Sequence, residues 1–197
     1  MATQQYDVWS VSPKADADFY VVSVTPSGAG ALGLVANTPG INGYGYKVSI
    51  TSVADETTKN FTITGIPVGS TQSVTEVVAG GNNTTVYSTN YFATVTSITV
   101  SAATAGAITV GYGGALALPR CRIKGVYYVG ASNAGSISIS DANSNPSPPR
   151  LYMDTPGSVT TSSSLYMAAE GILVGQAQYG YAIVTLDQVT KVTLICG

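Results

Sequence analysis

Few side chains in this sequence could carry out chemistry. The 197 residues include no histidine, and only 9% of them are charged. Acid–base and covalent catalysis need proton-transfer groups or an activated nucleophile. The best candidates are Asp154 and Glu170, each of which follows a predicted strand with a tyrosine. Two opposed carboxyl groups could hydrolyse a glycoside, but carboxylates in turns or at strand edges are far more common, so we expect no enzyme.

Metal and disulfide chemistry also have little support. Two cysteines, Cys121 and Cys196, without any histidine argue against a zinc site. The acidic runs at Ala15–Asp18 and Asp55–Glu56 lack the regular oxygen-ligand spacing of a calcium loop. We expect solvated acidic turns, no metal and no cofactor. We expect the cysteines to be buried thiols. Both lie in strand-like segments, so a disulfide between them is the alternative.

Aromatic residues are candidates for binding. Thirteen tyrosines are many for this length, and tyrosine is enriched at interfaces because its ring buries area while its hydroxyl finds a partner. The alternatives are a place in the core and a sugar-binding platform. The single tryptophan could anchor a partner or fill the chain's own core. The aromatic candidates for an interface are Trp9, Tyr44, Tyr46, Tyr127, Tyr179 and Tyr181.

Three basic residues cluster in the second half of the chain. Arg120, Arg122 and Lys124 alternate with Cys121 and Ile123, so on a strand all three would point the same way. Such a row could meet an acidic patch on a neighbouring protein. It could equally protect an edge strand from pairing with another chain.

Composition narrows the range of partners. Eight Lys and Arg against ten Asp and Glu give a net charge of −2, without the basic footprint of a nucleic-acid or membrane-surface protein. Soluble proteins usually stay apart by carrying charge. A nearly neutral surface therefore favours packing against copies of itself or a lattice, and the alternative is a secreted domain with a polar, uncharged surface. Met1–Tyr20 does not resemble a signal peptide, and no apolar stretch is long enough for a membrane helix.

Short alternating segments separated by turns dominate the chain. Examples are Tyr46–Val53, Asn60–Gly65 and Phe92–Val100, and Phe61 and Ile63 should share one face of their strand. Strands of this length with frequent turns predict an antiparallel β-sandwich. Val, Ile, Thr and Tyr suit the pleated surface, and Gly and Asn suit its turns.

A composition break at Gly113–Pro119 divides the chain. Both halves end with a strand that contains Val-Thr, a further alternating strand and a glycine. We therefore predict an all-β protein with two tandem antiparallel sandwich domains, Ig-like or jelly-roll-like. The predicted organisation is an N-terminal arm at 1–25, a first domain at 26–114 and a second domain at 115–197.

Motifs in the first half occur in a specific order: "ADADFYVVSVTPSGAGALGL", then "KVSITSVADETTKNFTITGI", then "VTEVVAGGNNTTVYSTNYFATVTSITVSAATAGAITVGYGG". This series, over residues 15–114, resembles a β-rich module in virion proteins of tailed bacteriophages. The chain departs from the module at "IPVGSTQS", which stands in place of a longer polar segment. Residues 118–197 resemble a second, generic phage β-module. The resemblance supplies no catalytic residues.

The resemblance implies a virion structural protein that assembles in the host cytoplasm. The expected role is that of a capsid decoration (cement) protein, which binds the major capsid protein on the outside of the head through many weak contacts. Other virion proteins and further copies of the chain, as a dimer or trimer, are expected partners. The alternatives are a neck, collar or tail component, and a glycan-binding module that uses the tyrosine pairs and the loop Asp141–Pro149.

Overall fold

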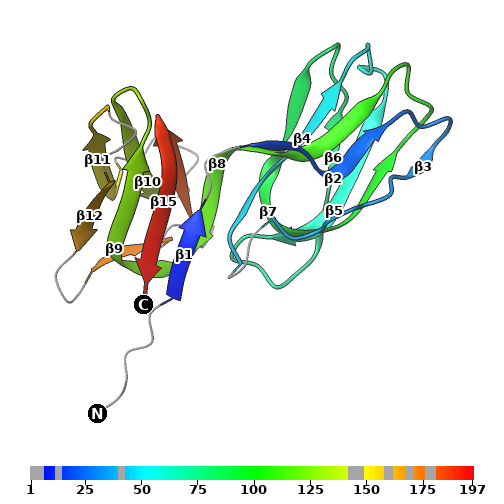
Figure 1. The fold of residues 1–197 in the computed structure, drawn as a ribbon. Helices are drawn as coiled ribbons and strands as arrows, with labels where there is room; N and C mark the ends of the chain where they lie inside the picture. Colours follow the sequence, from blue (N-terminus) through cyan, green and yellow to red (C-terminus); the bar gives the residue numbers. More distant parts are fainter. Residues whose placement is uncertain are drawn as a thin grey trace. The chain divides into compact units, whose positions relative to one another are not determined.

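The computed structural model describes residues 7–11, 15–39, 43–141, 149–157, 162–166, 171–175 and 181–197. The regular elements within these ranges are β-strands, and they pair antiparallel (Figure 1). The predicted all-β class is thus confirmed. Across the same ranges there is no helix with the length and apolar character needed to cross a membrane.

Two compact units make up the chain. One comprises residues 15–114, and the other combines residues 1–14 with residues 115–197. The break after Gly114 falls at the residue where the sequence predicts a joint. The first fourteen residues, however, belong with the C-terminal half.

The N-terminal segment differs from the predicted arm at 1–25. Asp7–Val11 forms strand β1, which pairs along β15 at the C-terminus. Asp16–Val24 forms strand β2 in the other unit, where Tyr20 and Val21 are buried. Backbone pairing makes both strands parts of the fold, and β2 also buries apolar side chains, whereas a free arm would leave these groups in water.

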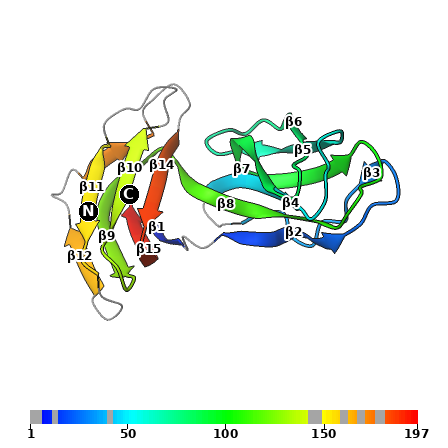
Figure 2. The ribbon, with the colours of Figure 1, turned by 90° about the horizontal axis from the view of Figure 1, so that it is seen from above.

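The unit of residues 15–114 is built on strands that share one hydrogen-bonded order, β8-β4-β7-β5-β6, with β2 on β8 and β3 on β7 (Figure 2). Strand β7 is long enough to pair with β4 along its first part and with β5 along its second part. The strands of this unit are β2 (Asp16–Val24), β3 (Gly30–Ala31), β4 (Gly45–Ser52), β5 (Asn60–Pro67), β6 (Val74–Ala79), β7 (Thr85–Val100) and the first part of β8 (Ile108–Pro119).

Alternation along the strands fills the core of this unit. Phe61 and Ile63 lie on the same face of β5 and are fully buried, as the sequence predicts. Across the ladder, Phe61 lies opposite Val78 and Val100. Burying an apolar side chain of this size contributes about 1.5–3 kcal/mol. The buried cluster consists of Tyr20, Val21, Leu32, Val48, Ile50, Phe61, Ile63, Val78, Phe92, Val95, Ile98, Val100, Ile108 and Val110.

Two strand glycines in this unit allow close backbone approach. A Cβ atom at Gly45 would overlap the backbone carbonyl of Phe92, and one at Gly111 would overlap the carbonyl of Asp16. Glycine inside a strand often marks such an approach. Both positions therefore need hydrogen as the side chain.

In the other unit, one sheet has the order β1-β15-β9-β12, with β13 also on β9, and the strands β11-β10-β14 continue from the end of β8. Ile123, Ile137, Ile139 and Leu194 are fully buried. The strands of this unit, besides β1, are β9 (Cys121–Gly130), β10 (Gly135–Asp141), β11 (Leu151–Thr155), β12 (Ser162–Tyr166), β13 (Ile172–Val174), β14 (Tyr181–Asp187) and β15 (Val189–Cys196).

The buried carboxylate of Asp141 lies at the C-terminal end of β10. Asp141 accepts a 2.8 Å hydrogen bond from Arg150 Nε and a 2.7 Å hydrogen bond from the backbone N–H of Gly175. These contacts join the end of β10 to the start of β11 and to the end of β13. Asp141 therefore has a structural partner on each carboxylate oxygen.

Candidate functional site

The outward side of β5, β6 and β7 forms an uncharged surface. On β5, Thr62 and Thr64 alternate with the buried Phe61 and Ile63, so they point away from the core. Directly opposite residues of antiparallel strands share a face, and the register therefore aligns two rows. We call these six residues the threonine face: Val77, Thr62 and Thr99 in one row, and Thr75, Thr64 and Ser97 in the other.

The threonine face offers methyl groups and hydroxyls but no charge. Thr75 is exposed and Val77 is 59% exposed, while the other four residues are half-buried. The Oγ1 atoms of Thr64 and Thr75 lie 3.2 Å apart and share a hydrogen bond. A surface of this kind can be covered by a partner without the large desolvation penalty of a buried charge.

Strand β6 carries Thr75 and Val77 of this face and forms the edge of the sheet. Its only strand partner in the described part of the chain is β5. Glu76 is the one charged residue of β6, and its carboxylate accepts hydrogen bonds from the backbone N–H groups of Thr89 and Asn90 and, at 2.9 Å, from Asn90 Nδ2. The negative charge of Glu76 is thus compensated by hydrogen-bond donors of β7 in the same unit. Edge strands usually carry charges that discourage pairing with other chains, and the outward side of β6 has none.

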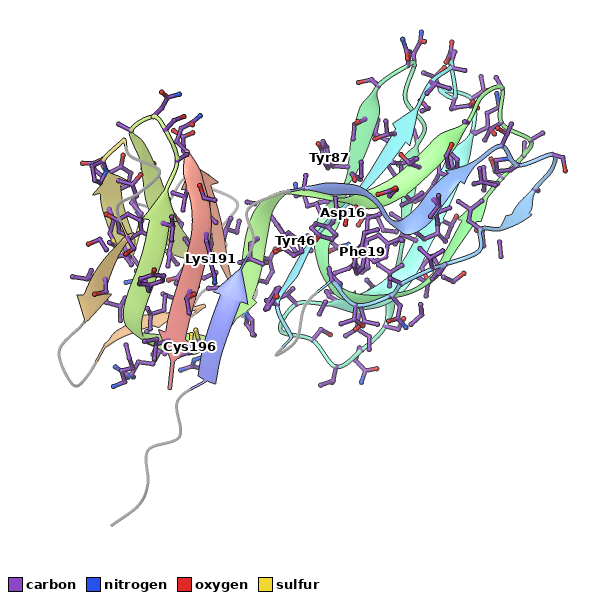
Figure 3. All side chains as sticks on the ribbon, viewed as in Figure 1. Asp16, Phe19, Tyr46, Tyr87, Lys191 and Cys196 are labelled. Carbon is purple, nitrogen blue, oxygen red and sulfur yellow. The ribbon has the colours of Figure 1, made fainter. Side chains whose placement is uncertain are left out.

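Tyr44 and Tyr46, expected at an interface, lie in a chain of aromatic rings and are buried. The Tyr46 ring stacks on Tyr112 at 4.4 Å between centroids, and Phe19 meets Tyr112 edge-on at 5.1 Å. Figure 3 labels Phe19 and Tyr46. Burial, followed by the neighbouring Tyr44 and Tyr112, raises the pKa of Tyr46 well above its ordinary value. Both residues therefore serve packing in this unit, because little of either ring remains for a partner.

The remaining aromatic candidates differ in their exposure and in how much of each the structure describes. Tyr127 on β9 is 38% exposed, and Tyr181 at the start of β14 is half-buried. Trp9 lies on β1 opposite Leu194, but its side chain, like the whole of Tyr179, lies outside the described residues.

Two tyrosines that the sequence did not single out are more exposed. Tyr87 on β7 is 50% exposed and Tyr152 on β11 is 57% exposed (Tyr87 is labelled in Figure 3). The alternation of Tyr152 with the buried Leu151 was a usable signal. Tyr87 had no comparable signal, because its neighbours Val86 and Ser88 are half-buried and buried, although one is apolar and the other polar.

The structure divides the predicted row of three cations. Arg120 is exposed in the bend that joins β8 to β9, outside the strands. Arg122 and Lys124 are half-buried on β9 and flank the fully buried Ile123. The predicted alternation therefore holds for Arg122 and Lys124, and Arg120 lies outside it.

Only one of the two predicted acidic candidates lies in a described part of the chain. Asp154 is exposed on β11, and Glu170 lies outside the described residues. Asp55 accepts hydrogen bonds from the backbone N–H of Thr57 at 3.0 Å and from its hydroxyl at 2.7 Å, and these lower the pKa of Asp55. Within the described ranges, no three Cys, Asp or Glu residues are grouped so as to hold a metal ion.

Glu56 differs from the solvated turn that the sequence predicts. Its side chain is fully buried, and Oε1 accepts a 2.9 Å hydrogen bond from the backbone N–H of Gly106. Lys59 Nζ lies 3.5 Å from Oε2. The backbone N–H of Glu56 also donates to the carbonyl of Gly81 at 2.9 Å. One acidic residue thus ties together three loops of the unit.

No protein-family model matches this chain, and no curated protein matches it in sequence. Function is therefore inferred from surface chemistry and from the resemblance of its motifs. The threonine face is the candidate site for two reasons. It is an uncharged surface on paired strands, and it includes the outward side of the edge strand β6, which carries no charge.

Proposed function

We propose that this chain is a structural protein of a tailed bacteriophage particle, made of two tandem β-sandwich domains. The threonine face carries the proposal, because it gives an uncharged surface on three paired strands. The ordered motifs over residues 15–114, which resemble a phage virion module, point in the same direction. A net charge of only −2 also suits a protein that packs in a lattice.

The proposed role within the particle is capsid decoration. In this role the threonine face lies against the major capsid protein on the outside of the head. One contact of this size is weak, because its few half-buried side chains gain little further burial. Many copies on one shell, linked to each other, multiply the effect. The head is then stabilised by additional non-covalent contacts between subunits, and this role requires no catalysis by the chain.

Binding to particles that lack the protein tests the role. Purified chain is added to such heads, which are then sedimented, and the bound fraction is measured. Val77→Lys places a charge on the threonine face, at the β6 end of one of its two rows, and should reduce binding at least about tenfold, since burying an unpaired ammonium costs more than 1.4 kcal/mol. Val53→Lys is the matched control, because Val53 is 65% exposed and lies off this face.

The outcomes separate the possible roles. Equal binding of both variants would remove the threonine face from the interface. Binding to isolated tails or necks but not to heads would favour the neck, collar or tail alternative. Binding to a glycan array without binding to any particle would overturn the virion proposal and favour a glycan-binding module.

A further inference from the structure

The two thiols of the chain meet in one unit. Cys121 begins β9 and Cys196 ends β15, and their Sγ atoms lie 3.1 Å apart. No disulfide joins them in this structure. Cys196 is 2% exposed and Cys121 is half-buried. Cys121 is therefore the more exposed of the two cysteines, and the sulfur of the buried Cys196 lies directly beside its own.

Strand pairing fixes this arrangement. Cys196 lies opposite Ile123 in the β15–β9 ladder, so Cys121 is its diagonal neighbour, two residues along β9. The backbone N–H of Gly197 donates to the carbonyl of Arg122 at 3.0 Å, which extends the pairing past Cys196. On its other side, Cys121 lies opposite Val174 of β13, which is fully buried. The two sulfurs are thus held together by backbone pairing on both sides of β9.

We propose that Cys121 and Cys196 form an oxidation site, in which a small-molecule disulfide converts the thiol pair into an intramolecular disulfide. The Cys121 thiolate attacks one sulfur of the reagent, forms a mixed disulfide and releases one small thiolate. The Cys196 thiolate then attacks Cys121 Sγ and releases the second. Two protons and two electrons pass from the protein to the reagent, which leaves as two reduced thiols.

The new bond locks a long stretch of chain. The cysteines are 75 positions apart, so the disulfide encloses most of residues 115–197. It also fastens β15 to β9, the two central strands of the order β1-β15-β9-β12. A cross-link over a long loop stabilises the folded form mainly by restricting the unfolded chain. The protein can therefore fold with thiols in a reducing compartment and become locked in an oxidising one. The inference does not depend on the proposed virion role.

Oxidation of the intact chain by oxidised glutathione tests the proposal. The intact mass should fall by two hydrogen atoms, without a retained glutathione. Tryptic digestion without reductant should give Cys121–Arg122 linked to Val192–Gly197, because trypsin cuts after Arg120, Arg122 and Lys191. The melting transition of this unit should rise by about 10 °C or more and return to its starting value on reduction.

Single-cysteine variants are the controls. Cys196→Ser should retain glutathione at Cys121, whereas Cys121→Ser should stay a thiol because Cys196 is buried. Cys196→Ala gives a second version of the buried change if serine prevents folding. Neither variant should show the rise in melting temperature. A stable mixed disulfide in the unsubstituted chain, a disulfide between two chains, or thiols that react only in denaturant would overturn the proposal.

Discussion

Replacing Glu56 by alanine should destabilise the unit of residues 15–114 by about 3–5 kcal/mol. The variant removes the acceptor of the 2.9 Å hydrogen bond from Gly106 N and leaves that N–H in a part-buried place, at a cost of about 1–3 kcal/mol. It also removes the 3.5 Å ion pair with Lys59, worth about 0.5–1 kcal/mol. The lost methylene groups of a fully buried side chain add about 1–1.5 kcal/mol.

Urea denaturation followed by circular dichroism measures the loss of stability, and hydrogen exchange locates it. For a unit of this size, the melting temperature should fall by at least about 12 °C. Protection should be lost first at Gly106, whose N–H loses its acceptor. The backbone bond of residue 56 to Gly81 remains possible in the variant, so the strands should still form.

Glu56→Gln is the matched control. Its amide oxygen can still accept the hydrogen bond from Gly106, and only the charge facing Lys59 is lost. We expect a loss of about 1 kcal/mol. A loss below about 1 kcal/mol for Glu56→Ala, or equal losses for the two variants, would refute the assignment of Glu56 as the acceptor that ties the loops.

Three further predictions follow from strand packing, the edge strand and an exposed carboxylate. Gly111→Ala should abolish folding, because the new Cβ would overlap a carbonyl of β2, whereas Gly28→Ala, which meets nothing within 4 Å, should melt like the unsubstituted protein. Glu76→Ala should cost about 1–3 kcal/mol and speed hydrogen exchange in β6, while Glu76→Gln should lose less than half of that; equal effects would contradict the hydrogen-bond account. Because Thr57 lowers the pKa of Asp55, the stability from this carboxylate is present above the unfolded pKa of about 4 and is lost as the pH falls through the lower folded value. Thr57→Ala keeps the backbone N–H and loses the hydroxyl donor, so an NMR titration should place the Asp55 inflection lower in the unsubstituted protein than in this variant; identical inflections would remove the hydroxyl as a cause.

Local alternation allowed part of the fold to be predicted. The pattern at Phe61 and Ile63 predicts their burial, and the same pattern places Thr62 and Thr64 on the outer side. The part of the threonine face that lies on β5 could thus be predicted from the sequence. Its continuation onto the neighbouring strands was not readable, because the register of strands far apart in sequence depends on the whole sheet.

Burial that depends on distant segments could not be predicted. Tyr46 alternates in phase with the buried Val48 and Ile50, so its side of β4 could be predicted, but the stacking of Tyr112, sixty-six positions later, could not. Glu56 resembles a solvated turn residue until the loop containing Gly106 closes over it. Each difference arises from contacts between segments far apart in sequence.

The number of copies per particle tests the central claim most directly. Quantitative mass spectrometry of purified phage particles gives the ratio of this chain to the major capsid protein. A capsid decoration role predicts a ratio near one to one or a simple fraction of it, because the sites repeat with the lattice. A handful of copies per particle would contradict decoration and indicate a neck or tail position. Absence from purified particles would contradict the virion role itself.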